Sequence, residues 1–204
     1  MATVLGFHQM PLAPVQLLWL NLVTDSLPAL ALGVEPVEEG VMEERPRDAR
    51  ESLFTRSFSL RLVWQGMMVG LLTLTAYFLG EYVLSDPGEA YQAANTMAFA
   101  TLTLCQLFHA FDVRSEEHSL LHIGIFSNPA MNKAFLAGVG MQLAVLCLPP
   151  LQRIFQTVPL NPVEWAVVLT LAVTPVVVCE GEKAWRRRRK NVKRKRKQVS
   201  YSKY

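Results

Sequence analysis

Five apolar stretches, each long enough to cross a lipid bilayer as a helix, constrain this chain more than any other feature. They lie at residues 15–34, 60–84, 93–111, 131–151 and 163–182. A helix needs about 20 residues to cross about 30 Å of hydrocarbon, and each stretch is near that length. The pattern predicts an all-α membrane protein, a bundle of about five transmembrane helices.

The remaining residues are too few to build a soluble domain beside this bundle. Apolar residues make up 51% of the 204, and charge is crowded into a few loops and the C-terminus. A soluble domain of this length would spread its charge more evenly. We therefore expect a membrane domain at residues 1–182 and a basic cytoplasmic tail at 183–204. Cys105, Cys147 and Cys179 fall on different stretches, in no Cys/His metal spacing, and are expected to pack as small apolar side chains.

The basic residues predict how the chain is oriented in the membrane. Lys and Arg gather in segments 35–57 and 112–133 and in the C-terminal tail, whereas residues 85–92 contain none and residues 152–161 contain one. Basic loops stay on the cytoplasmic side. Five spans that end in a basic C-terminus then predict an integral protein of the cell membrane, with its N-terminus outside and its C-terminus in the cytoplasm.

The first apolar stretch contains a small group of polar side chains near its middle. A charged Asp at the centre of a bilayer costs about 2.5–3.5 kcal/mol on insertion scales, so such residues usually face a bundle interior and mark an ion path. Asn21, Thr24 and Asp25 are spaced so that a helix puts them on one face. Neutral and charged oxygens of this kind suit a hard cation such as Ca²⁺.

A proline follows this group and adds a further oxygen. Pro28 has no N–H to donate to the carbonyl of Thr24, and its ring clashes with that group, so we expect a helix break beside the three side chains. Broken helices with free carbonyls coordinate ions in membrane transporters. The alternative is that Pro28 makes an ordinary kink and that Asp25 is a paired structural carboxylate.

Two later stretches contain further candidate residues. Gly66 and Gly70 lie four apart, which allows two helices to approach closely, although glycine pairs are common in membrane helices. Gln106 and His109 share a helix face. Gln106 is either an ion ligand or an interhelical hydrogen bond worth about 0.6 kcal/mol. His109 and Asp112 are expected at the membrane interface rather than as ligands.

The C-terminal tail begins with charged residues of both signs and becomes strongly basic. Glu180 and Glu182 are expected to form surface ion pairs with Lys183 and Arg186. The basic run consists of Arg186, Arg187, Arg188, Arg189 and Lys190. Beside an anionic leaflet each charge is worth about 1 kcal/mol. We expect this tail to bind anionic lipids at the bilayer and not nucleic acid, because a tail next to a membrane helix meets lipid first.

The run from Pro14 to Ala29, Pro-Val-Gln-Leu-Leu-Trp-Leu-Asn-Leu-Val-Thr-Asp-Ser-Leu-Pro-Ala, resembles the sixth membrane helix of P-type Ca²⁺-ATPases. Its Asn-x-x-Thr-Asp form is closest to the sarcoplasmic-reticulum type, including bacterial members. Pumps for Na⁺ and K⁺ usually carry Asp at the position of Asn21, and the family has Gly at the position of Ser26. Three later segments are also similar to the C-terminal domain of cation-transporting ATPases: Phe126-Ser-Asn-Pro, Pro149-Pro-Leu-Gln and Phe155-Gln-Thr-Val-Pro-Leu.

This resemblance implies helices six to ten of such a pump, with Ca²⁺ as the transported ion. Asn21 and Asp25 would be its main ligands, and Thr24 and Gln106 weaker contributors. Gln106 falls where sarcoplasmic-reticulum-type pumps carry a Glu ligand, and the lost charge suggests one ion per cycle. Mg²⁺ and ATP would serve only the full-length parent. The expected partners are the lipid bilayer and the parent's other helices and cytoplasmic domains, because the family's phosphorylated Asp-Lys-Thr-Gly motif is absent here.

Two other interpretations are compatible with the same residues. One is the same fold transporting Mn²⁺ or another cation, because oxygen ligands serve several divalent ions. The other is a non-catalytic helical membrane protein that assembles with a partner or regulates it through the face containing Gly66 and Gly70.

Overall fold

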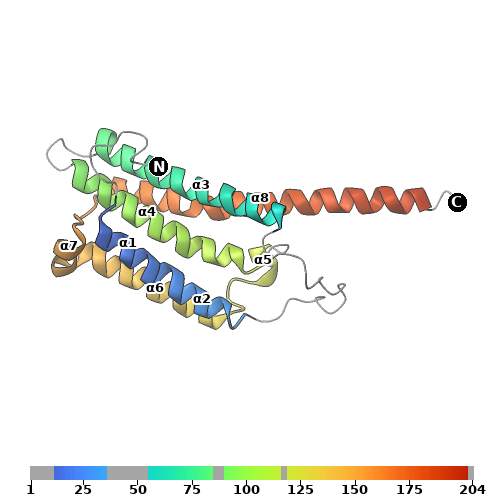
Figure 1. Cartoon of the computed structure of the whole chain (residues 1–204), viewed down its shortest axis with the longest axis horizontal. Coiled ribbons are helices and arrows are strands. Elements are labelled where there is room, and N and C mark those ends of the chain that lie inside the picture. The colour runs from blue at the N-terminus through green and yellow to red at the C-terminus, as the bar shows by residue number, and fades with distance from the viewer. Residues whose placement is uncertain (1–11, 36–54, 85–89, 116–118, 202–204) are drawn as a thin grey trace.

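The computed structural model of the chain describes residues 12–35, 55–84, 90–115 and 119–201, and within these ranges the ordered elements are all helices. Figure 1 shows an elongated bundle of helices that run side by side, with the last helix projecting beyond the others. In chain order the elements are α1 (Pro14–Leu20), the π-helical η1 (Asn21–Asp25), α2 (Ser26–Leu32), α3 (Arg56–Leu79), the π-helical η3 (Gly80–Leu84), α4 (Ala90–Val113), α5 (Leu120–Ile123), α6 (Pro129–Cys147), α7 (Pro149–Phe155) and α8 (Pro162–Tyr201).

Four helical stretches in the described part of the chain are long and apolar enough to cross a membrane. They are Pro14–Leu32, Phe58–Leu84, Pro129–Cys147 and Pro162–Arg187. They coincide with four of the five predicted spans, and the all-α membrane fold is confirmed. The remaining predicted span, residues 93–111, lies within α4, which is 24 residues long but does not reach the same apolar content.

α4 is the central helix of the bundle. It contacts α3, α6, α8 and η1, and in Figure 1 it runs between α3 and the pair formed by α1 and α6. Every residue from Ala93 to Thr101 is buried. Neighbouring helices rather than lipid cover much of its surface, so polar side chains such as Asn95 and Gln106 are tolerated there. Its lower apolar content therefore follows from its central position.

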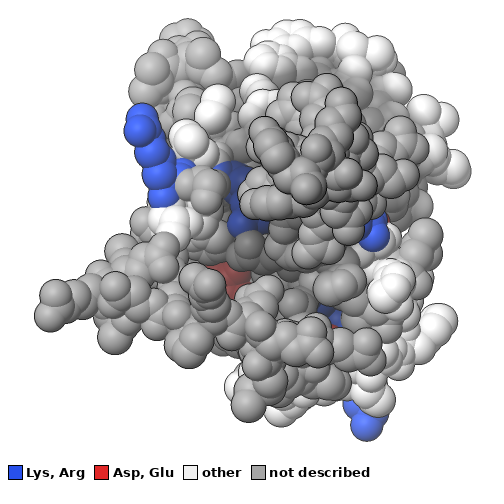
Figure 2. Space-filling view, turned by 90° about the vertical axis from the view of Figure 1, so that its right-hand side faces the viewer, with Lys and Arg blue, Asp and Glu red and all other residues white. Residues whose placement is uncertain are grey.

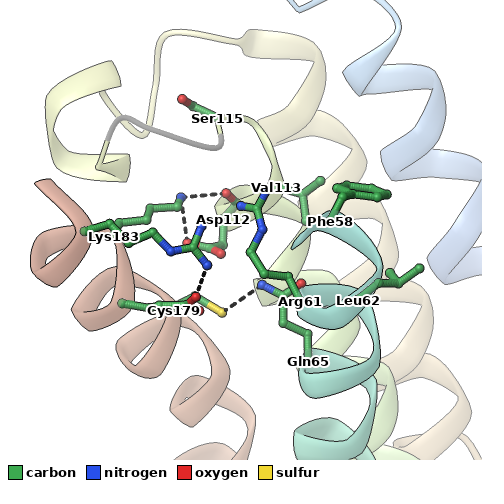
Figure 3. A pocket seen from close by; sticks show the side chains of 11 residues that line it. Phe58, Arg61, Leu62, Gln65, Asp112, Val113, Ser115, Cys179 and Lys183 are labelled. Carbon is green, nitrogen blue, oxygen red and sulfur yellow. Dashed lines mark hydrogen bonds and ion pairs between the residues drawn. The ribbon is translucent and has the colours of Figure 1, made fainter. Parts of the chain in front are cut away.

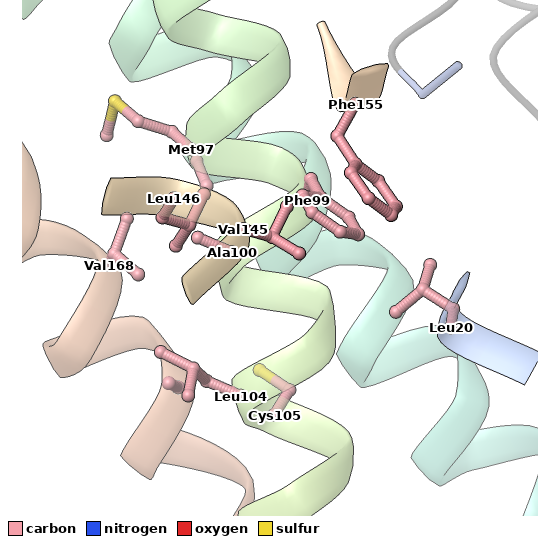
Figure 4. Close-up of a cluster of buried hydrophobic side chains, with 12 residues drawn as sticks. Leu20, Met97, Phe99, Ala100, Leu104, Cys105, Val145, Leu146, Phe155 and Val168 are labelled. Carbon is pink, nitrogen blue, oxygen red and sulfur yellow. The ribbon is translucent and has the colours of Figure 1, made fainter. Parts of the chain in front are cut away.

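The largest cluster of buried apolar side chains in the described part of the chain surrounds the middle of α4. Figure 4 shows Phe99 and Leu104 of α4 among side chains from α1, α6, α7 and α8. Phe155 of α7 stacks on Phe99 with ring centroids 6.3 Å apart, and it meets Trp19 of α1 edge-on at 5.1 Å. The short helix α7 thereby closes one end of the core and packs α1 against α4.

Two glycines allow the helices to approach α4 closely. A Cβ atom added at Gly80 would lie 2.7 Å from the Cα of Ala94, and one added at Gly138 would lie 2.8 Å from Cδ2 of Leu107. By contrast, Cβ atoms added at Gly66 and Gly70 would meet no heavy atom within 4 Å. Gly66 and Gly70 are thus exposed on α3, and no helix in the described part of the chain packs against them. Their role in helix packing stays a prediction.

The ends of three helices are joined by a charged cluster that consists of Glu35, Arg114 and Asn128. The Nε and Nη2 atoms of Arg114 donate hydrogen bonds to Glu35, at 3.0 and 2.6 Å from its Oε1. Asn128 Nδ2 donates to Glu35 Oε2 at 2.6 Å and to the carbonyl oxygen of Ala31 at 3.1 Å. The Glu35 cluster therefore holds together the residues that follow α2, the end of α4 and the start of α6.

Asn128 has a second role as the N-cap of α6. Its Oδ1 accepts hydrogen bonds from the backbone N–H groups of Ala130 and Met131, and Pro129 occupies the first helical position. Both features satisfy or remove donors that a helix start leaves unpaired. Asn followed by Pro, as in Phe126-Ser-Asn-Pro, is a sequence pattern that predicts a helix N-cap, and the structure confirms the cap. The predicted boundary at residue 182 is not marked by a change of element, because α8 continues through it to Tyr201.

Candidate functional site

The candidate site is built on η1, the π-helical segment Asn21–Asp25. π-turns are rare and often occur at functional sites. Pro28 explains the position of this one, since it cannot donate to the carbonyl four residues earlier and its ring would clash with it. The chain remains helical from Pro14 to Leu32. The structure therefore accommodates Pro28 by widening the helix rather than by interrupting it.

Thr24 faces inward and joins η1 to α4. Its Oγ1 lies 2.5 Å from the carbonyl oxygen of Leu20 and 2.6 Å from Oε1 of Gln106. A hydroxyl group has one proton to donate, so it can satisfy only one of these two acceptors. The Thr24 hydroxyl therefore links the side-chain amide of Gln106 on α4 to the backbone of η1.

Asn21 and Asp25 face the opposite way. Both are exposed on the outer side of η1, whereas Thr24 is buried with 5% of its surface accessible. The predicted single face is therefore divided into an outward pair, Asn21 and Asp25, and an inward pair, Thr24 and Gln106. In the described part of the chain no side chain forms an ion pair or hydrogen bond with Asp25, so the structure does not make it the paired structural carboxylate of the alternative interpretation.

Buried amide groups position this segment in the bundle. Gln16 of α1 is fully buried, and its Nε2 donates to Oδ1 of Asn95 at 2.6 Å and to the carbonyl oxygen of Phe155 at 2.9 Å. Trp19 Nε1 donates to Oε1 of Gln142 on α6 at 3.1 Å. These bonds fix the rotation of α1 about its axis, and hence the direction in which η1 presents its side chains. Sequence reasoning missed these residues, although each is a polar side chain within an apolar run.

Sequence comparison identifies the family to which this arrangement belongs. A family model described as "Cation transporting ATPase, C-terminus" matches residues 9–185. The chain belongs to that family. The predicted resemblance to the C-terminal part of P-type Ca²⁺-ATPases is thereby confirmed.

Several proteins similar to this ATPase C-terminal domain are named as calcium-transporting ATPases. It is 41% identical over 192 residues to calcium-transporting ATPase 1 of Bacillus cereus, an alignment that covers 88% of this chain and 21% of the relative. It is 40% identical over 172 residues to the calcium-transporting ATPase of Bacillus subtilis, covering 84% and 19%. It is 31% identical over 196 residues to the human calcium-transporting ATPase type 2C member 1, covering 95% and 21%. The chain spans about a fifth of the length of these relatives.

Asp112, at the end of α4, is buried against Lys183 of α8 in this ATPase domain. Asp112 has 3% of its surface accessible, and its Oδ1 lies 2.8 Å from Nζ of Lys183, which has 9% accessible. Lys183 also donates to the carbonyl oxygen of Asp112 at 2.7 Å. α8 passes directly beside the end of α4 and covers Asp112. Its expected position at the membrane interface stays a prediction.

The charged start of the tail is partly as expected. Glu182 and Arg186 form the predicted ion pair. Glu180 lies 3.6 Å from Nζ of Lys183, but its carboxylate also accepts hydrogen bonds from Oγ of Ser119 and from the backbone N–H of Leu120. Glu180 therefore ties α8 to the start of α5 and is not simply a surface residue. The side chains of Arg188, Arg189 and Lys190 lie outside the described part of the structure.

Basic side chains concentrate at one end of this ATPase domain. Figure 2 views the bundle from the end where the C-terminus lies, and Lys and Arg side chains appear at several points on this face. Among residues with described side chains, this end includes Arg56 and Arg61 at the start of α3, Lys133 near the start of α6, and Arg186 on α8. Arg153, on α7, lies at the other end.

Proposed function

We propose that this chain is the C-terminal membrane part of a P-type Ca²⁺ pump and supplies part of the intramembrane site for ATP-driven Ca²⁺ export. The observation that carries the proposal is the π-helical segment with the Asp25 carboxylate, which has no partner in the described part of the chain and lies exposed on a helix of membrane-spanning length. An ionised carboxylate facing lipid is costly. Its persistence at this depth is explained if a cation neutralises it during a transport cycle.

The outward and the inward pair of candidate ligands would have different roles in binding the ion. Asn21 and Asp25 would supply an amide oxygen and a charged oxygen to the ion, from the side of η1 that no described helix covers. Thr24 and Gln106 would hold η1 against α4 and contribute weaker oxygens from the inner side. Because Gln106 has no charge, the set favours one Ca²⁺ per cycle.

The other ligands and the energy source would come from the rest of the pump. The outward face of η1 and the open glycine face at Gly66 and Gly70 are the surfaces that we assign to the pump's other membrane helices. ATP, Mg²⁺ and the phosphorylated aspartate would belong to its cytoplasmic domains. The positive-inside rule then places the basic end of the bundle in the cytoplasm and the N-terminus outside, with anionic lipids at the tail.

Replacement of one carboxylate oxygen tests the proposal. In the full-length protein, Asp25→Asn should abolish Ca²⁺-dependent phosphorylation by ATP, because the neutral amide no longer compensates the charge of the ion. Ser26→Ala is the matched control, since Ser26 is the adjacent exposed residue and is assigned no ligand role. Normal Ca²⁺ dependence in the Asp25→Asn protein would refute the assignment.

Mn²⁺ is the second candidate ion, because every assigned ligand atom is an oxygen and oxygen ligands serve Mn²⁺ as well as Ca²⁺. Transport assays in which each metal competes with the other separate the two. A Ca²⁺ pump should retain Ca²⁺ transport when Mn²⁺ is present at equal concentration. Stronger inhibition of Ca²⁺ uptake by Mn²⁺ than by added unlabelled Ca²⁺ would instead identify a Mn²⁺ pump.

A further inference from the structure

A second group of metal-binding side chain types lies at the basic end of the bundle, where α4 ends beside α8. The side chains of His109, Asp112 and Cys179 converge there, with one potential donor atom from each within 4.8 Å of the others. Nδ1 of His109 lies 3.9 Å from Sγ of Cys179 and 4.0 Å from Oδ2 of Asp112. Cys179 is 70 residues from His109 in the chain, so no short sequence motif could have predicted that these side chains meet.

His109 and Asp112 lie further apart than a direct hydrogen bond would place them, whereas His109 and Cys179 lie within the range of a long hydrogen bond between nitrogen and sulfur. A nitrogen–oxygen hydrogen bond is about 2.7–3.2 Å long, well short of the distance from His109 to Asp112. Ligands that share a tetrahedral Zn²⁺ stand about 3.4 Å apart for nitrogen and oxygen and about 3.6 Å apart for nitrogen and sulfur, from the usual bond lengths to zinc. The observed distances therefore need to close by only about half an ångström to hold such an ion.

We propose that His109, Asp112 and Cys179 bind a divalent metal ion of the Zn²⁺ class. Imidazole, carboxylate and thiolate are the three side-chain ligands that Zn²⁺ takes in proteins, and a site with three protein ligands leaves a fourth position for water. Ca²⁺ prefers oxygen ligands throughout, so this group discriminates against the ion assigned to η1. The proposal does not depend on the function proposed above.

A cavity gives the ion a path to this group. The cavity has a volume of about 110 Å³, and Asp112 and Cys179 are among its lining residues, with Phe58, Arg61 and Gln65 of α3 on the opposite side. Figure 3 shows Gln65 directed toward the sulfur of Cys179, and its Nε2 lies 3.5 Å from Sγ. The amide of Gln65 therefore lies beside the sulfur, among the residues that line the cavity. Binding displaces the thiol proton, which leaves to water.

Lys183 is the competing cation that this group must accommodate. Its Nζ lies 2.8 Å from Oδ1 of Asp112, whereas Oδ2 is the oxygen that faces His109. Figure 3 marks the ion pair between Lys183 and Asp112. The two carboxylate oxygens can therefore serve the ammonium group and the metal at the same time. The positive charge of Lys183 lowers the affinity of this group for a second cation. The bound ion would clamp α4 to α8.

Cobalt substitution provides a direct test in the intact protein, purified at its natural length in detergent. Titration with Co²⁺ should produce the absorption band of a thiolate–Co²⁺ bond, saturating at one ion per chain. Stoichiometric Zn²⁺ should remove the band, and excess Ca²⁺ should not. Cys179→Ser should lose it. Cys105→Ser is the matched control, because Cys105 is also buried in the bundle but lies outside the group, and it should keep the band.

Three results would overturn the proposal: no band in the unmutated protein, a band that survives Cys179→Ser, or a band that Cys105→Ser also removes. A measurement without substitution guards against misfolded variants. Alkylation of Cys179, followed by mass spectrometry of its peptide, should be slowed at least tenfold by Zn²⁺, whereas alkylation of the exposed Cys147 should be unchanged. Equal alkylation of Cys179 with and without Zn²⁺ would also overturn the proposal.

Discussion

Asp25 and Glu35 are carboxylates close together in the sequence, yet the structure treats them in opposite ways. Glu35 accepts hydrogen bonds from Arg114 and Asn128, and the side chain of Arg114 is fully buried. Asp25 is exposed on a helix of membrane-spanning length and has no partner in the part of the chain that the structure describes. A charge that is satisfied from within the fold stabilises the fold, whereas a charge left open is available to a ligand. The difference separates a structural carboxylate from a candidate functional one.

The largest effect that tests this difference between Glu35 and Asp25 is expected when Arg114, the partner of Glu35, is removed. Arg114→Ala should lower the free energy of unfolding by about 3 kcal/mol, because it leaves Glu35 charged and largely buried without its cation. Asp25→Ala should not lower the same quantity, because Asp25 makes no described contact that the folded state would lose. Denaturant titration of the purified protein in mixed micelles measures both. Equal losses would show that Asp25 is as structural as Glu35.

A smaller effect is expected at the residue that links Glu35 to α6. Asn128→Ala should cost about 1–2 kcal/mol, because it removes the N-cap of α6 together with a donor to Glu35. Asn132→Ala, one turn further along the same helix, is the matched control and should cost less than about 0.5 kcal/mol. The same denaturant titration compares them. If the control variant lost as much stability as Asn128→Ala, the cap would not be the source of the effect.

The smallest expected effect is a dependence on pH. Burial raises the pKa of Glu35, but the hydrogen bonds from Arg114 and Asn128 and the charge of Arg114 outweigh it and hold the pKa below its ordinary value of 4.5. A depressed pKa means that the folded state binds fewer protons than the unfolded state near this pH, so this contribution to stability is present above pH 4.5 and is lost as the pH falls through the folded pKa.

Melting temperatures measured at several pH values below neutrality check this contribution. The unmutated protein should lose stability as the pH falls below about 4.5, and a Glu35→Gln variant should lose less over the same range. Parallel curves for the two proteins would show that Glu35 does not titrate with folding.

Local patterns predicted the elements of this protein well. Apolar stretches of about 20 residues predicted its membrane-length helices, since length and hydropathy are properties of each segment alone. The cap formed by Asn128 and Pro129 and the ion pair of Glu182 with Arg186 followed from spacings of one to four residues. The family followed from the run that contains Asn21 and Asp25. All of these depend on neighbours in the chain.

Local patterns did not indicate which helices of this chain pack together. The closely spaced pair Gly66 and Gly70 faces outward, whereas the isolated Gly80 and Gly138 make the close contacts with α4. The sequence also did not indicate that Asp112 is buried, because α8, which covers the end of α4, lies far from it in the chain. A glycine or a carboxylate looks the same in the sequence whether or not another helix lies against it.

The sequence by itself therefore determined that this chain forms membrane helices, where most of them begin and end, and to which family they belong. Only the tertiary structure decided that α4 is central, that Thr24 turns inward to Gln106 while Asp25 stays open, and that His109 and Cys179 meet across 70 residues. The physical reason is that helix formation depends on local periodicity, end residues and length, whereas the partner of a buried or exposed group is set by the rotation and order of whole helices.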